Sequence, residues 1–380
     1  MYCCFLSQLD LTIGPLERGD GKCQGASKKA IQHFDKYQDV KYFHFDVPPG
    51  TSYVLTADPW SFLQAWLVQK LPKKRSKNRQ CLTRAKYYSQ LAADFYHAAE
   101  ATQFPIKSTL AYYGMLNLVK CFLSVRGVEL ESTWEHHGLS LPLNKKQTVQ
   151  VSNSSNGISI FAEFAKLLGK PVSSPHELSI KDVICHIPEL HEMMYSLGQL
   201  PWSGRKFLPV QIDFLVNSGK DKLFTEIKYE KRNEARVSTA KFSKGDRKRY
   251  FVKREEENGW VIYRSKNRKS VSQKNFHQIY HNIQKEYVHF DLASLLTRSG
   301  YKYYCDLQPG PHHHLSFSLA LLFYLGSVAR YRPTEVEELT TGEISPLVSE
   351  ALAVIPRQFL YQLVSSTTGN VCVIPQAKLE

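Results

Sequence analysis

Four polar residues interrupt the otherwise apolar segment 105–126. Tyr113, Asn117, Lys120 and Ser124 follow one another at steps of four, three and four residues, so they share one face of a helix. Burying an amide or an ammonium group is costly unless each finds a partner. The spacing predicts a polar pocket for a phosphate or a base, with Tyr113 and Asn117 as nucleic-acid-binding residues. The alternative is a solvated stripe or a partner interface.

A pair of histidines follows that helix, in the run Glu135-His136-His137-Gly138-Leu139. Imidazole is the side chain best suited to transferring protons near neutral pH. We therefore treat His137 as a candidate general base or acid. A histidine beside a glycine in a loop is also commonly a hydrogen-bonding cap, so the pattern alone leaves both interpretations open.

Two arginines, Arg330 and Arg332, end a second apolar stretch just before Pro333. Guanidinium groups bind phosphate through paired hydrogen bonds, but cations are also favoured at a helix C-terminus. If folding brings Arg330 together with Lys120 and His137, the three predict RNA cleavage without a metal. His137 would move the proton, and the two cations would stabilise the pentacovalent phosphate.

A different chemistry is suggested by Asp213 and the later Glu226-Ile227-Lys228. An acid on one strand and Glu-x-Lys on its hairpin partner is the pattern of the PD-(D/E)xK nucleases. There, two carboxylates hold Mg²⁺ and the lysine orients the attacking water. Alternating exposed charges on a strand explain the pattern as well. Mg²⁺ is expected only in this alternative, and no cofactor is predicted otherwise.

The net charge of +14 comes from 49 Lys and Arg against 35 Asp and Glu, and it is concentrated in two windows. Residues 61–90 hold eight basic and no acidic residues, and residues 201–290 hold 21 basic and 10 acidic ones. This segregation disfavours an acidic carrier and makes nucleic acid the first expected partner. The proposed contacts in these windows are Lys73, Lys74, Arg75, Arg247, Lys248 and Arg249.

The hydrophobic periodicity of the sequence predicts the helices and strands that hold these residues. Helices are predicted at 60–71, 80–103, 105–126, 157–168, 179–197 (broken at Pro188), 312–329 and 344–363. Strands are predicted at 40–46, 206–216, 223–229, 259–263 and 301–307, with a hairpin turn at 217–219 and a polar loop at 231–257. The histidines 312–314 follow Pro-Gly-Pro, which predicts a loop and helix N-cap in preference to a metal site.

The 380 residues are enough for two domains or one domain with an insertion. We predict an α+β protein, mainly α, whose helical-bundle core is interrupted by a basic, strand-rich insert. The segments are a lead-in at 1–57, the first part of the core at 58–200, the insert at 201–310 and the rest of the core at 311–380.

The sequence shows no secretory or membrane signal. No basic, apolar leader opens the chain, and no run reaches the ~18 apolar residues that span a bilayer. The eight cysteines form no Cys-x-x-Cys pair. We therefore expect a cytoplasmic protein with reduced thiols and no membrane partner.

The run Ile106 to Lys120 resembles the signature helix of the YaaC-like family of bacterial proteins. His137-Gly138-Leu139, the segment 187–191 and Ala329-Arg330-Tyr331-x-Pro333 follow in the family's order, so the resemblance covers about 60–363. It implies no settled activity. The tyrosine-rich helix and the His-Gly-Leu are similar to HEPN helical proteins, many of which are ribonucleases or parts of defence systems.

That analogy implies a nucleic-acid-associated component of antiviral defence, acting with a partner protein or as a homo-oligomer. The sequence departs from HEPN ribonucleases, which place a His a few residues after an Arg. Here Arg126 precedes His136 and His137 by ten and eleven residues, and no His follows Arg330. A composite site remains as one interpretation, and a non-catalytic binding or scaffold subunit as another.

Overall fold

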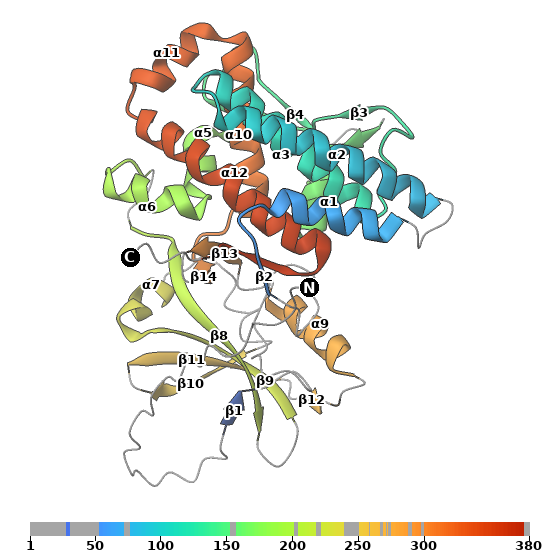
Figure 1. Cartoon of the computed structure of the whole chain (residues 1–380). Coiled ribbons are helices and arrows are strands. Elements are labelled where there is room, and N and C mark those ends of the chain that lie inside the picture. The colour runs from blue at the N-terminus through green and yellow to red at the C-terminus, as the bar shows by residue number, and fades with distance from the viewer. Residues whose placement is uncertain are drawn as a thin grey trace, which may run out of the picture.

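The structure, a computed structural model, is an α+β protein dominated by helices, as predicted (Figure 1). It describes residues 28–30, 53–71, 77–152, 157–200, 204–217, 222–238, 251–257, 259–266, 269–270, 272, 275–287, 291–297 and 300–375. The predicted strand at 40–46 lies outside these residues. So do Lys73, Lys74, Arg75, Arg247, Lys248 and Arg249.

Helix α3 (Ile106–Val125) lies at the centre of the helical part. It packs against α2 (Lys77–Glu100) as an antiparallel hairpin and against α10 (His314–Tyr331) and α12 (Ser345–Thr368), while α1 (Pro59–Lys70) lies on α2. At Gly326 a Cβ would lie 3.1 Å from the Ser108 carbonyl oxygen, so glycine permits the close approach of α10 to α3. The predicted helices 60–71, 80–103, 105–126 and 344–363 are confirmed to within a few residues.

Shorter elements surround this bundle. They are β3 (Glu135–His136), β4 (Leu139–Ser140), β5 (Thr148–Val151), β6 (Ile158–Ser159), β7 (His176–Ser179), α4 (Ile160–Leu167), α5 (Ile180–Cys185), α6 (Pro188–Ser196) and α11 (Pro333–Thr341). The break predicted at Pro188 is confirmed, because α5 ends at Cys185 and Pro188 opens α6. Among the described residues, no helix is both long and apolar enough to cross a membrane.

The strand-rich part forms one antiparallel sheet in the order β10-β11-β9-β8-β14-β13, below the helices in Figure 1. Its strands are β8 (Phe207–Asn217), β9 (Lys222–Glu230), β10 (Phe251–Glu257), β11 (Trp260–Ser265), β13 (Leu292–Thr297) and β14 (Gly300–Asp306). Strand β1 (Lys28–Ala30) pairs with β8, and β12 (Lys269–Ser270) pairs with β9. Separately, β2 (Tyr53–Leu55) pairs with β15 (Val371–Val373).

Helix α9 (Phe276–Tyr287) covers one face of this sheet and builds a second hydrophobic core. Its apolar residues recur at steps of three and four, in Phe276, Ile279, Tyr280, Ile283 and Tyr287. Leu208, Val210 and Phe214 of β8 point into the same core. Because side chains alternate along a strand, the residues between them point to the opposite face.

The prediction of a loop at 231–257 is wrong at both ends of the segment, where the structure has helices and a strand. Residues Lys231–Asn233 form a 3₁₀ helix, α7 spans Glu234–Ser238, and Phe251–Glu257 form β10. Strand β10 lies at the end of the strand order and pairs with β11, and polar sequences are common in edge strands. Its polar composition therefore describes an edge strand and not a loop.

Candidate functional sites

His137 lies between β3 and β4, against helix α3. Its Nδ1 is 2.9 Å from the hydroxyl of buried Tyr112, and its carbonyl accepts a hydrogen bond from the Phe161 amide at 3.1 Å. Gly138 has φ +78°, and a Cβ there would meet Ser159 Oγ at 2.1 Å. The turn after His137 therefore requires glycine, and both the ring and the backbone of His137 are held in place.

The charges around His137 favour its neutral form. Burial lowers the pKa of the imidazole, and the positive charges of Lys120 and Arg330 lower it further. Both cations from the sequence prediction thus lie close enough to act on the same imidazole. A neutral imidazole at pH 7 can accept a proton, and two nearby cations suit a developing negative charge.

Each of these cations also has a protein partner. Lys120 Nζ is 2.9 Å from Glu135 Oε2 and lies 5.2 Å from the centre of the Tyr88 ring. Arg330 donates to the Tyr113 hydroxyl at 2.6 Å and, through Nε, to the Gly326 carbonyl at 3.0 Å. The Tyr113 ring in turn stacks on Phe95. The two cations are therefore positioned by α3, β3 and the end of α10, and both remain partly exposed.

Asn117 and Arg332, which the sequence suggested as nucleic-acid contacts, form hydrogen bonds within the protein. The Asn117 side chain donates to the Tyr113 carbonyl at 2.8 Å and is buried. Arg332 binds the carbonyls of Pro142 and Lys145 and the carboxylate of Glu335. These contacts support helix α3 and anchor the loop before β5 to the start of α11. A nucleic-acid contact by Asn117 or Arg332 stays a prediction.

The acidic pattern of the insert forms a cluster on the sheet. Asp213 on β8 lies directly opposite Glu226 on β9, and Lys228 Nζ is 2.8 Å from Asp213 Oδ2 and 3.6 Å from Glu226 Oε2. Arg264 on β11, which the sequence did not suggest, binds Glu226 with its Nε at 2.7 Å. Asp213 is exposed by 41%, whereas the Glu226 side chain is buried. The described residues contain no group of three or more potential metal ligands.

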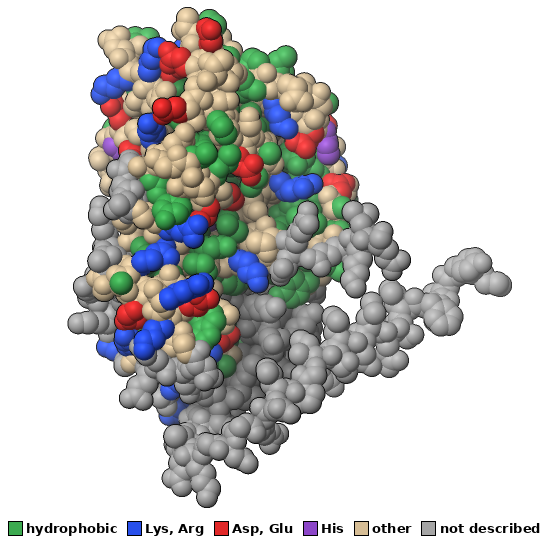
Figure 2. Space-filling model, turned by 90° about the vertical axis from the view of Figure 1, so that its left-hand side faces the viewer, with side chains coloured by type: hydrophobic (Ala, Val, Ile, Leu, Met, Phe, Trp, Pro, Cys, Tyr) green, Lys and Arg blue, Asp and Glu red, His purple; other side chains and the backbone are tan. Residues whose placement is uncertain are grey.

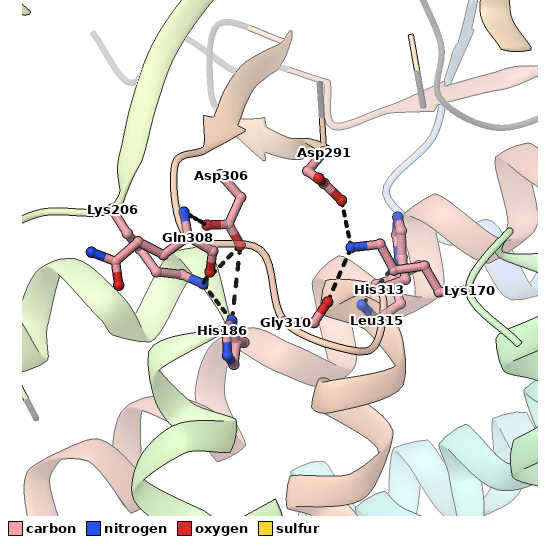
Figure 3. A network of polar contacts seen from close by, with 9 residues as sticks. All are labelled: Lys170, His186, Lys206, Asp291, Asp306, Gln308, Gly310, His313 and Leu315. Atoms are coloured by element: carbon pink, nitrogen blue, oxygen red, sulfur yellow. Dashed lines mark hydrogen bonds and ion pairs between the residues drawn. The ribbon is translucent and has the colours of Figure 1, made fainter. Parts of the chain in front are cut away.

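A third cluster, which we call the junction network, joins the helices to the sheet and escaped the sequence prediction (Figure 3). Lys206, whose side chain is fully buried, donates to Asp306 Oδ2 at 2.7 Å, to the Gln308 carbonyl at 3.2 Å and to His186 Nδ1. Lys206 directly precedes β8, Asp306 ends β14 and His186 caps α5. No short motif signals this cluster, because its lysine and aspartate are 100 positions apart.

The junction network holds its charges in a dry environment. Burial lowers the pKa of the Lys206 ammonium. Burial alone would raise the pKa of Asp306, but the nearby His186 ring, 3.9 Å away, and the charge and hydrogen bond of Lys206 outweigh burial, so this pKa lies below its usual value. Beside them, Lys170 binds Asp291 and the Gly310 carbonyl, as Figure 3 also shows. The Lys170–Asp291 pair connects the helical part to the start of β13, and the contact of Lys206 with His186 connects α5 to β8 and β14.

Comparison with known proteins places these sites within one family. A family model described as YaaC-like Protein matches residues 54–367. The chain belongs to the YaaC-like family. No curated protein and no solved structure matches it. The matched region of this YaaC-like protein contains the His137 site, the sheet cluster and the junction network.

This YaaC-like protein also has a cavity of about 520 Å³ on the sheet, again outside the sequence prediction. Residues of β8, β9, β11, β14 and α7 line it, among them four cationic side chains. Figure 2 shows Lys and Arg side chains spread over one face of the molecule, among acidic and hydrophobic ones. The cationic residues were visible in the composition of the insert, but their convergence depends on the order of the strands.

Proposed function

We propose that this YaaC-like protein binds nucleic acid and cleaves RNA at His137 without a metal ion. The proposal is carried by one observation: burial of the His137 imidazole, together with the charges of Lys120 and Arg330, lowers its pKa and favours the neutral form. The basic insert supplies the attraction for a polyanion. A role in antiviral defence, with a partner protein or as a homo-oligomer, would follow from the resemblance to HEPN proteins.

The reaction that fits this geometry is attack of a ribose 2′-hydroxyl on the adjacent phosphate. Tyr112 binds Nδ1, so when Nδ1 carries the hydrogen, Nε2 is the base that takes the 2′-hydroxyl proton. The bond between phosphorus and the 5′-oxygen breaks, and the departing 5′-oxygen takes a proton from water or from the protonated imidazole, which yields a 2′,3′-cyclic phosphate and a 5′-hydroxyl. Lys120 and Arg330 would stabilise the negative charge that develops on the phosphoryl oxygens.

Cleavage of RNA by this protein should depend on His137. Cleavage of end-labelled RNA should persist in EDTA and fall by ~10²–10⁴-fold in His137→Ala, the usual contribution of a general base. The matched control is His97→Ala, which removes an exposed histidine on α2 and should cleave like the wild type. Circular dichroism checks that both variants fold. Equal cleavage by His137→Ala and wild type would contradict the mechanism.

A second candidate function is Mg²⁺-dependent nucleic-acid cleavage at Asp213, Glu226 and Lys228. It is favoured by the direct cross-strand pairing of the two carboxylates and by the contact of Lys228 with both. Asp213 and Glu226 would hold the ion, and Lys228 would orient the attacking water.

This candidate makes a separate prediction for the same assay. Cleavage should then require Mg²⁺, disappear in EDTA and be lost in Asp213→Asn and Lys228→Ala, while His137→Ala remains active. Lys222→Ala, an exposed lysine on the same strand, serves as the control. Retention of nucleic acid that weakens with salt, with no cleavage under either condition, would instead indicate a binding or scaffold subunit.

A further inference from the structure

Most of the strand residues that line the cavity point to the sheet face opposite helix α9. Leu208 and Val210 point into the α9 core, so Pro209 and Gln211 between them point to the other face. Strand pairing brings Tyr304 of β14 beside Pro209, and Trp260 of β11 beside Glu230 of β9. These residues line the cavity, which therefore sits across four neighbouring strands.

The lining is strongly cationic. Arg205, Arg232, Arg236 and Lys302 face a single carboxylate, that of Glu230. Arg205 pairs with Glu192 at 2.9 Å and Arg232 pairs with Glu230, and all four of these side chains are well exposed to solvent. Such exposed pairs exchange readily for a ligand, since each is worth little.

The other two cations differ from these pairs. Arg236 donates to the carbonyls of Arg205 and Phe207 and to Asn233 Oδ1, and these bonds fix the guanidinium in place. Lys302 is exposed, and no ion pair to it is found among the described residues. The cavity thus holds positive charge that its own carboxylate does not balance, and this favours an anionic ligand.

Aromatic rings give the cavity a second kind of contact. Trp260 and Tyr304 are both partly exposed. Trp260 lies opposite Glu230 on the neighbouring strand, and Tyr304 lies opposite Pro209. Burial raises the pKa of Tyr304, so its hydroxyl remains a neutral donor. Stacking on aromatic faces is how proteins bind nucleobases without reading their sequence, and arginine and lysine are the usual partners of phosphate.

We propose that this cavity binds a nucleotide, with the base against Trp260 and Tyr304 and the phosphate against Lys302 and the neighbouring arginines. Its volume lies within the ~300–1,000 Å³ of small-molecule pockets. The ligand can be a free mononucleotide or one nucleotide of an RNA strand, which share this chemistry. The site is distinct from His137, so it does not depend on the proposed cleavage.

Calorimetric titration of the full chain with the four ribonucleoside 5′-monophosphates tests this site. At least one should bind more tightly than its nucleoside, ribose 5-phosphate or inorganic phosphate, because each of these lacks one half of the recognised group. Lys302→Ala and Trp260→Ala should each weaken that binding about tenfold. Trp260→Phe, which keeps an aromatic ring, should retain most of the wild-type affinity. Lys222→Ala, on β9 outside the cavity, should leave the affinity unchanged.

Several results would overturn the proposal. They are no binding of any nucleotide at millimolar concentration, inorganic phosphate binding as tightly as the best nucleotide, or affinity unchanged in Lys302→Ala. Displacement of the bound nucleotide by an RNA octamer would assign the cavity to an RNA strand, and its failure would assign it to a free nucleotide. Retained nucleotide binding in His137→Ala separates this site from the proposed cleavage site.

Discussion

Asp306→Asn is expected to lower the free energy of unfolding by about 3–5 kcal/mol, the usual cost of removing one partner of a buried ion pair. The variant leaves the Lys206 ammonium without its carboxylate in a site where its side chain has no solvent exposure. Asparagine keeps the size of the residue and an oxygen that can accept from the Gln308 amide, as Asp306 does at 2.9 Å. The loss would therefore report the charge and not the shape.

Urea unfolding followed by circular dichroism measures this change. Glu177→Gln breaks the exposed pair with Lys145 and is the matched control, expected to cost less than about 1 kcal/mol. The double variant Lys206→Met with Asp306→Asn should recover part of the loss, since no buried charge is then unpaired. Equal stability of Asp306→Asn and wild type would show that Lys206 discards its charge at little cost.

The helices could be predicted because their apolar residues recur at helical spacing over long stretches. Segment 105–126 is an example, and its observed bounds differ by one residue at each end. Helix α9 has the same kind of spacing, but polar residues between its apolar ones give it the composition of a loop. Strand β10 was missed for a related reason, because edge strands often have polar sequences that resemble those of loops.

Whether a site could be predicted depends on how far apart in the sequence its contacting residues lie. The Asp213, Glu226 and Lys228 cluster was predictable because a short hairpin fixes the register of β8 and β9. Arg264, the junction network and the cavity were not, because they depend on which strands become neighbours across the sheet. Lys206 and Asp306 are separated by most of the insert, and local spacing carries no information about such a pair.

Acid should destabilise the protein strongly between pH 6.5 and pH 4, because buried histidines must stay neutral in the folded state. Burial is the main cause that lowers the pKa of His191 and His312 to about 4 and of His314 to about 3. All three side chains lie in the core, with exposures of 0%, 3% and 7%. In the unfolded chain the pKa of a histidine is ~6.5. The buried neutral histidines therefore stabilise the folded state fully above that pH, and this stability is lost as the pH falls.

At pH 5 the unfolded chain holds nearly one more proton at each of these positions than the folded chain does. Each then lowers the free energy of unfolding by about 2 kcal/mol relative to pH 7. Glu189, whose pKa burial raises to about 7, has the opposite effect and offsets roughly one of these three contributions. Because single domains are stable by only about 5–15 kcal/mol, urea unfolding should show a large loss at pH 5. A free energy of unfolding that stays constant from pH 7 to pH 5 would contradict the lowered pKa values.

His191→Gln isolates one of these histidines. The His191 Nε2 accepts the Lys206 amide at 3.0 Å, and the glutamine carbonyl oxygen can accept the same bond without titrating. The slope of unfolding free energy against pH between 6 and 4.5 should decrease by about 1.4 kcal/mol per pH unit, the value for one proton. At pH 8 neither state protonates His191, so the slopes of variant and wild type should coincide there. An unchanged slope in the acid range would assign the proton uptake to other groups.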